Sequence, residues 1–184
     1  ITANMCITTQ SMRGLHHFGP LCQDMGIEQL HIDQVRPADA GRRTEAEYRA
    51  MIPPYQEMAP HFDAMLKALE EWSPAFDVNV GNYPYCLLPQ WSHRIHHDGL
   101  NTFTYAASST EILPAFDKYP QKKAGKFHPA SCEKCVFRQR CNGIFDYYDH
   151  LYGHEEFQPI QAEDLLRLDV RQHAFIERNQ VVVD

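Results

Sequence analysis

Residues 1–36, ITANMCITTQSMRGLHHFGPLCQDMGIEQLHIDQVR, decide the fold. Polar and apolar residues alternate from Ile1 to Thr9, and this period of two predicts a strand with one apolar face. The segment from Ser11 to Met25 has apolar residues at helical spacing, with Ser11 as the expected N-cap and Gly26 as the stop. A second alternating segment runs from Ile27 to Arg36. Together they predict a βαβ unit with parallel strands and a right-handed crossover.

The following segments continue this pattern. Thr44 and Glu47 have the spacing of a capping box, which predicts the start of a helix. Pro53-Pro54 and Pro60 are expected to break or kink this helix, because proline lacks the amide hydrogen that a helix needs. A third two-faced strand is predicted from Phe76 to Val80.

Each predicted strand keeps one polar face, whereas strands of a sheet covered on both sides are apolar throughout. We therefore expect helices on the apolar face only, with the polar faces lining a concave surface, as in a partial or open βα barrel. The alternative is that the polar faces contact solvent or another segment. The polar-face residues are Asn4, Cys6, Thr8, His31, Asp33, Asp77 and Asn79.

Ligands of βα barrels bind at the carboxyl ends of the strands. This rule makes Gln34, Arg36, Asn79 and Asn82 the candidate pocket residues.

The second informative stretch contains Cys132, Cys135 and Cys141 in the spacing C-x2-C-x5-C, with Cys86 upstream. Four thiols brought together can hold a tetrahedral zinc ion or a cubane iron–sulfur cluster, and the spacing alone leaves both open. Cys6 and Cys22 are expected to be buried thiols; a cavity-lining role for Cys6 stays open. We expect a reducing, cytoplasmic compartment, since metal ligation fits the clustered cysteines better than disulfides.

A histidine-rich turn lies between the two stretches. His93, His96 and His97 crowd together with Asp98. Such a cluster could bind a metal, but the spacing matches no strong motif, and a solvated polar turn is the simpler interpretation.

The net charge of −7 over 184 residues argues against nucleic-acid binding. No apolar run is long enough to predict a membrane span. Seven of the 17 lysines and arginines lie between Lys118 and Arg140. They form either a solvated basic loop or a docking surface for an acidic electron donor or an anionic substrate group.

Three regions are expected. Residues 1–82 should hold the strands and helices of the partial barrel, residues 83–160 a small α+β domain around the cysteines, and residues 161–184 a helix and tail. Within them, we predict a short strand at 101–107, a loop at 118–129, an aromatic helix at 144–152 and an amphipathic helix at 161–179.

The cysteine stretch also resembles a known family. Its triplet is followed by Asn142-Gly143, an aromatic helix and the ending Tyr152, Gly153, Glu156, Phe157 and Pro159. This pattern is similar to the C-terminal part of radical S-adenosylmethionine (SAM) enzymes with a SPASM or twitch auxiliary-cluster domain. The first third, with Asn4 on its first strand and Arg36-Pro37 closing its second, resembles the last strands of their partial (β/α)6 barrel.

The resemblance implies a 4Fe–4S auxiliary cluster held by Cys86, Cys132, Cys135 and Cys141, with Lys134, Arg138 and Arg140 tuning its potential. It also implies Asn4, Gln34, Arg36 and Asn79 as cofactor-binding residues. The C-x3-C-x2-C loop that binds the SAM-cleaving cluster is not in this sequence. We therefore expect a second cluster and SAM in a missing N-terminal half or a partner chain. Phe145 occupies the position of a further family cysteine, which favours one auxiliary cluster.

The expected function is a maturase-type oxidoreductase that uses a 5′-deoxyadenosyl radical on a peptide or small molecule, with flavodoxin or ferredoxin as the electron donor. Two alternatives stay open: a zinc-binding structural module and a catalytically inactive partner subunit.

Overall fold

A computed structural model describes residues 1–36, 42–96, 103–104, 110–112, 114–117, 120 and 123–167. The first elements are β1 (Thr2–Ile7), η1 (Met12–His17), α1 (Phe18–Asp24), β2 (Gln29–Gln34), α2 (Glu45–Met51), α3 (Tyr55–Trp72) and β3 (Asp77–Gly81). They are followed by η2 (Tyr85–Leu87), η3 (Pro89–Arg94), β4 (Ile95–His96), β5 (Phe103–Thr104), β6 (Phe116–Asp117), β7 (Lys126–Phe127), η4 (Ala130–Lys134), β8 (Ile144–Phe145), α5 (Asp146–Tyr152) and α6 (Ala162–Leu165).

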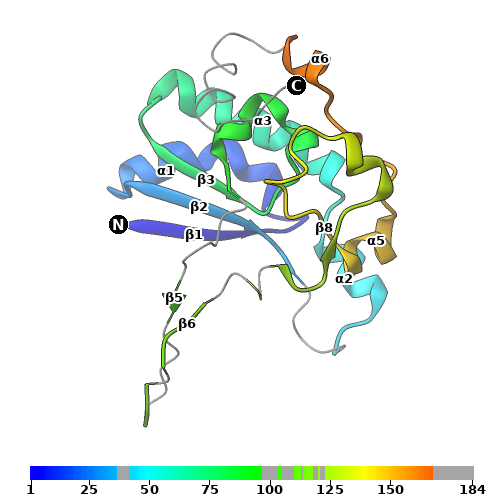
Figure 1. Ribbon diagram of the computed structural model, residues 1–184. Helices are drawn as coiled ribbons and strands as arrows, with labels where there is room; N and C mark the ends of the chain where they lie inside the picture. Colours follow the sequence, from blue (N-terminus) through cyan, green and yellow to red (C-terminus); the bar gives the residue numbers. More distant parts are fainter. Residues whose placement is uncertain are drawn as a thin grey trace.

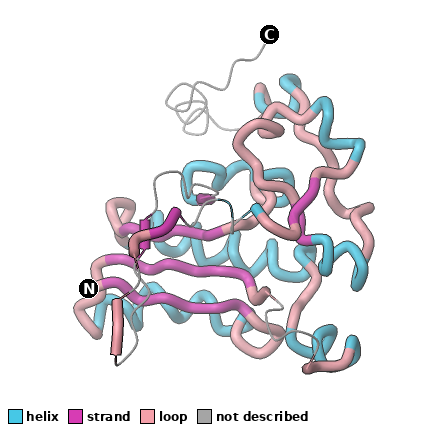
Figure 2. The backbone as a smooth tube through the Cα atoms, turned by 60° about the horizontal axis from the view of Figure 1, so that its bottom comes forward, coloured by secondary structure: helices cyan, strands magenta, loops and turns pink. Residues whose placement is uncertain are grey.

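The main sheet is parallel, with its strands in the order β1-β2-β3-β4. The helices α1 and α3 lie on one side of it (Figures 1 and 2). Neighbouring parallel strands must be joined by crossovers. Among the described residues, helices cover only this side of the sheet, and we call the opposite side the uncovered face. The prediction of a mixed α/β fold with a small parallel sheet is therefore confirmed.

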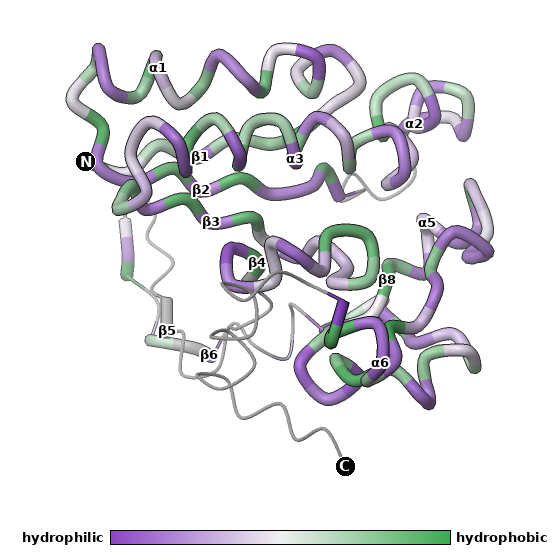
Figure 3. Tube along the Cα trace, turned by 90° about the horizontal axis from the view of Figure 1, so that it is seen from above, coloured by the Kyte–Doolittle hydropathy of each residue, from purple (hydrophilic) through white to green (hydrophobic). Residues whose placement is uncertain are grey.

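The two faces of the sheet differ as the alternation predicts. Leu30, Ile32, Val78 and Val80 are at most 3% exposed and face the helices. Hydropathy alternates along β2 and β3 (Figure 3). Burial of these side chains against the helices is the main stabilising contribution of this layer.

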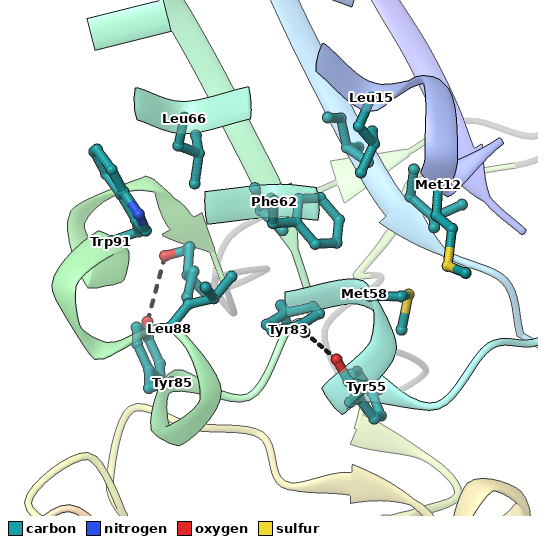
Figure 4. Packing of buried hydrophobic residues seen from close by; sticks show 14 of the residues in the cluster. Met12, Leu15, Tyr55, Met58, Phe62, Leu66, Tyr83, Tyr85, Leu88 and Trp91 are labelled. Carbon is teal, nitrogen blue, oxygen red and sulfur yellow. Dashed lines mark hydrogen bonds between the residues drawn. The ribbon is translucent and has the colours of Figure 1, made fainter. Parts of the chain in front are cut away.

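Helix α3 is the centre of the core. Its residues Tyr55, Met58, Phe62 and Leu66 are at most 2% exposed, and they pack against Tyr83 and neighbouring side chains of the segment after β3 (Figure 4). The Tyr83 hydroxyl donates to the carbonyl of Tyr55 at 2.7 Å, so this buried hydroxyl has a partner.

The cysteine region is attached at the start of α3. This helix follows Pro54, which has no side chain that can cap it. The hydroxyl of Tyr148 accepts the amide hydrogen of Tyr55 at 2.9 Å, and Glu156 accepts that of Gln56 at 2.8 Å. The same hydroxyl donates to the other carboxylate oxygen of Glu156. A carboxylate at a helix N-terminus interacts favourably with the helix dipole, so these contacts cap α3 from a distant segment.

Several local predictions are confirmed. The capping box forms at Thr44 and Glu47, and α2 ends before Pro53. Gly26 follows α1 with φ of +65°, a conformation that favours glycine. Gly153 ends α5 in the same region of φ.

Other local predictions are wrong. The break predicted at Pro60 does not occur: α3 runs from Tyr55 to Trp72 with Pro60 inside it, in its second turn. The proline there removes the hydrogen bond to the carbonyl of Gln56. Ser11 occupies the predicted N-cap position, but its side chain makes no capping hydrogen bond: its hydroxyl accepts the amide of Thr8 at 2.9 Å, and the first turn is a 3-10 helix. The predicted loop at 118–129 contains strand β7, which pairs with β8.

Some predictions lie partly outside the described residues. Only residues 103–104 of the predicted strand at 101–107 are described, and they pair with β6. For the helix predicted at 161–179, α6 accounts for Ala162–Leu165, and residues 168–179 lie outside the described part.

Candidate functional site: a four-cysteine pocket at the end of the sheet

The loop that carries three of the cysteines is closed by a short ladder. Strands β7 and β8 pair antiparallel, Lys126 with Phe145 and Phe127 with Ile144, so residues 128–143 form one loop. Inside it, the amide of Cys135 donates to the carbonyl of Cys132 at 3.1 Å, which makes the C-x2-C segment a tight turn. The amide of Val136 donates to the carbonyl of Ile160 at 3.0 Å and ties the loop to the segment after α5.

All four predicted cysteine ligands line a single pocket. Cys132, Cys135 and Cys141 come from the loop, and Cys86 comes from η2. The space between the pocket atoms is about 390 Å³, including the part open to solvent. The nearest of the three loop cysteines, Cys132, lies 46 positions after Cys86 in the sequence (132 minus 86). The fold brings these distant segments together.

The walls of the pocket are mainly apolar. Tyr85 stacks on Phe137 with ring centroids 4.8 Å apart and an interplanar angle of 11°. Phe137, Ile144 and Phe157 are 1–2% exposed. Arg138 is the one lysine or arginine of the pocket lining, and no aspartate or glutamate belongs to that lining.

Burial controls the protonation of these thiols. It raises the pKa of Cys141 to about 11, against the effect of amide hydrogens from Gly143 and Tyr85 that point at the sulfur. Burial also raises the pKa of Cys86, and the nearby Cys141, Cys135 and Cys132 raise it further. The pKa of Cys132 is raised chiefly by burial. At neutral pH these thiols carry protons, which a metal centre would have to displace.

Gly143 shapes the end of the loop. Its φ is +79°, and a Cβ at this position would lie 2.0 Å from the carbonyl oxygen of Phe127. Its amide nitrogen lies 3.4 Å from the sulfur of Cys141, as the donor of an N–H···S hydrogen bond. This hydrogen bond lowers the pKa of the Cys141 thiol against the effect of burial, so the glycine acts on the sulfur as well as on the backbone.

In the described part of the chain, no three His, Cys, Asp or Glu side chains are arranged to hold a metal ion. Of the predicted histidine cluster, His93 is exposed on η3 and His96 belongs to β4, while His97 and Asp98 lie outside the described residues.

The two remaining cysteines are placed differently from each other. Cys22 is 2% exposed in the core, as predicted. Cys6 is exposed on the uncovered face of β1, so the expectation of a buried thiol is wrong for it. Cysteine usually lies in the interior, but Cys6 alternates with Met5 and Ile7 along β1 and therefore lies on the opposite, exposed face.

The uncovered face of the sheet carries polar residues in register. Asn4, His31 and Asn79 are Cα partners across β1, β2 and β3, and Cys6, Asp33 and Gly81 form the next row. The carboxylate of Asp33 lies over Gly81, where a Cβ would stand 2.1 Å from its Oδ1. Asp33 therefore needs a glycine as its cross-strand neighbour.

A chain of polar contacts leads from this face to the cysteine region. His31 Nε2 lies 2.9 Å from Asp33 Oδ2, and Asn82 donates to Asp33 Oδ1 at 3.3 Å. Lys126 on β7 in turn donates to the Oδ1 of Asn82 at 2.5 Å. Asn82 adopts φ of +59°, which asparagine tolerates better than most residues.

The sequence-predicted pocket residues divide into two groups. Asn4 and Asn79 lie in one cross-strand row, and Asn82 joins the contact chain. Gln34 accepts from the hydroxyl of Tyr55 at the end of β2. The guanidinium carbon of Arg36 lies 5.8 Å from the centre of the Phe145 ring, so Arg36 contacts the cysteine region itself.

Two of these residues have polar atoms without a partner. The Oδ1 of Asn79 and the Nε2 of Gln34 are buried and make no hydrogen bond within the described structure. Buried polar atoms almost always have a partner, which can be protein, water or ligand.

Sequence reasoning missed three side chains around the cysteines. His128 lines the pocket, and its Nε2 donates to the carbonyl of Cys141 at 2.8 Å. The ammonium nitrogen of Lys126 lies over the Phe145 ring, 4.6 Å from its centre. Only His128 carries no sequence signal, since Lys126 belongs to the basic residues between Lys118 and Arg140 and Phe145 to the predicted aromatic helix. Their positions around the pocket were missed because β7 and β8 are too short to produce a pattern.

Comparison with protein-family models, curated proteins and solved structures finds no match for this chain. Among the described residues, no helix has the length and apolar character needed to cross a membrane.

Proposed function

We propose that this chain provides the auxiliary-cluster part of a radical SAM enzyme, with one 4Fe–4S cluster held by Cys86, Cys132, Cys135 and Cys141. The observation that carries the proposal is that these thiols, from two separate segments, line one mainly apolar pocket. In fold terms the proposal corresponds to a partial (β/α)6 barrel followed by a twitch-like domain.

The residues of the pocket fit such a cluster. Four cysteine thiolates are the usual ligands of a 4Fe–4S cluster, and apolar walls limit the access of solvent. The amide of Gly143 would donate to the sulfur of Cys141. Arg138 would balance part of the negative charge. When bound, the cluster would supply one-electron redox chemistry beside the substrate.

The uncovered face of the sheet would receive SAM and the substrate. Asn4 and Asn79 lie on this face, and Gln34 and Arg36 lie at the carboxyl end of β2; these four are the proposed cofactor-binding residues. The unpartnered Oδ1 of Asn79 supports the assignment, because a polar ligand on this face would satisfy it.

The SAM-cleaving cluster would come from a preceding segment or a partner chain, since C-x3-C-x2-C is not in these residues. An apolar groove between β1 and α1 supports this arrangement. Leu21 and Met25 line it and are 47% and 64% exposed. A further βα unit on the edge of β1 would cover them, as α1 and α3 cover β2 and β3. We propose an acidic protein such as flavodoxin or ferredoxin as electron donor and a peptide or small molecule as substrate.

Anaerobic reconstitution with iron and sulfide tests the proposal. We expect a brown protein with broad absorption near about 400 nm and about four irons per chain. Serine at Cys86 should lower the iron content as strongly as serine at Cys141. Serine at Cys6 is the matched control and should leave it unchanged, because Cys6 lies outside the pocket.

Two outcomes would reject the cluster. A colourless chain that binds one zinc through the same cysteines would instead identify a structural zinc module. Full iron loading of the Cys86→Ser variant would remove Cys86 from the ligand set and with it the four-thiol site.

A further inference from the structure

A second pocket lies beside the cysteine pocket and differs from it in charge. Lys123, Lys126 and Arg138 line it, together with His128, Gln139, Cys141 and Asn142. The space between its atoms is about 610 Å³, including the part open to solvent. Three cationic side chains and no carboxylate belong to this lining, although the whole chain carries a net charge of −7.

The cations come from β7 and from the segments before and after it. Lys126 lies on β7, Lys123 precedes this strand and Arg138 belongs to the cysteine loop. Lys126 also contacts Asn82 and the Phe145 ring, so its ammonium group is held in place at the end of the sheet. A carboxylate or phosphate bridging Lys126 and Arg138 would therefore meet one positioned donor and one planar guanidinium fork.

His128 also lines this pocket, but its Nε2 hydrogen is used by the Cys141 carbonyl. Positive charge in the pocket comes from the lysines and the arginine.

We propose that this pocket binds the anionic group, carboxylate or phosphate, of a small-molecule ligand. Cys141 lines both pockets, so the anion would lie next to the cysteine site. Under the proposed function, on which this role rests, the anionic end of the substrate would sit beside the cluster. Binding of the anion itself requires only the residues of the second pocket.

Thermal unfolding of the full chain in inorganic phosphate, against sodium chloride at equal ionic strength, tests the proposal. We expect a saturable rise in Tm with phosphate in the millimolar range. Arg138→Gln should raise the phosphate concentration for half of the effect about tenfold, since it removes a charge-assisted bidentate contact. The charge-matched control is Arg13→Gln, because Arg13 is an exposed residue of η1. This control also corrects for the general stabilising effect of phosphate.

Equal responses of Arg138→Gln and Arg13→Gln to both phosphate and malonate would overturn the proposal, as would rises in Tm that saturate with neither anion. Lys123→Gln, at an exposed position, replaces Arg138→Gln if that variant does not fold. A parallel series with malonate separates the ligand classes: a response to either anion supports the pocket, and a response to neither overturns it. Iron content is measured on the same samples. It shows whether a variant has lost anion binding alone or has also lost the cluster.

Discussion

At the residue scale, Gly143 is the position where the cysteine loop tolerates least change. A side chain at this position would be strained by the positive φ, and its methyl group would clash with the carbonyl of Phe127. We expect Gly143→Ala to lower the free energy of unfolding by at least about 2 kcal/mol in urea denaturation. Gly14→Ala is the control, because nothing lies within 4 Å of its Cβ position. Equal midpoints for the two variants would mean that the loop can relax around the methyl group.

The thiol of Cys141 should react slowly in the cluster-free chain. Its pKa of about 11 keeps it protonated at pH 8, where only about one molecule in a thousand is the reactive thiolate. We expect its alkylation by iodoacetamide to increase with pH through about 11, whereas the exposed Cys6 is modified first at pH 8. Mass spectrometry of the modified peptides measures both rates. Modification of Cys141 as fast as Cys6 at pH 8 would show that the pocket is open to solvent.

At the element scale, Glu156 is expected to carry much of the attachment between α3 and the cysteine region. Glu156→Ala removes the acceptor of the Gln56 amide and should cost about 1.5–3 kcal/mol in unfolding free energy. Glu156→Gln keeps an acceptor but loses the charge, so its cost should be smaller. Glu71→Gln, exposed near the other end of α3, is the control and should change stability little. A cost as small as that of the control would mean that packing alone attaches the region.

The turn after β3 allows backbone and side-chain effects to be separated. Both Asn82→Ala and Asn82→Gly lose the contacts with Asp33 and Lys126. Only alanine also carries a Cβ that is strained at φ of +59°, so it should be less stable than glycine by about 1 kcal/mol. Chemical denaturation of the pair measures this difference. Identical stabilities would indicate that the turn changes conformation in the alanine variant.

At the scale of the whole molecule, the sequence predicted the features that have a regular pattern along the chain. It missed the features that depend on contacts between distant segments. Alternation identified β1, β2 and β3 and the polar face, because one face of each strand is more buried than the other. Cysteine spacing identified the residues that share the pocket. The ladder of β7 and β8, the position of His128 and the cap on α3 depend on contacts between distant segments, which leave no local pattern.

The cap on α3 also makes this helix a distant sensor of the cysteine pocket. Glu156 is followed directly by Phe157, which lines that pocket. Whatever fixes the loop should therefore slow hydrogen–deuterium exchange at the amides of Tyr55 and Gln56, although neither residue lines the pocket. Exchange at these two amides would report occupancy of the pocket without any label placed near the sulfurs.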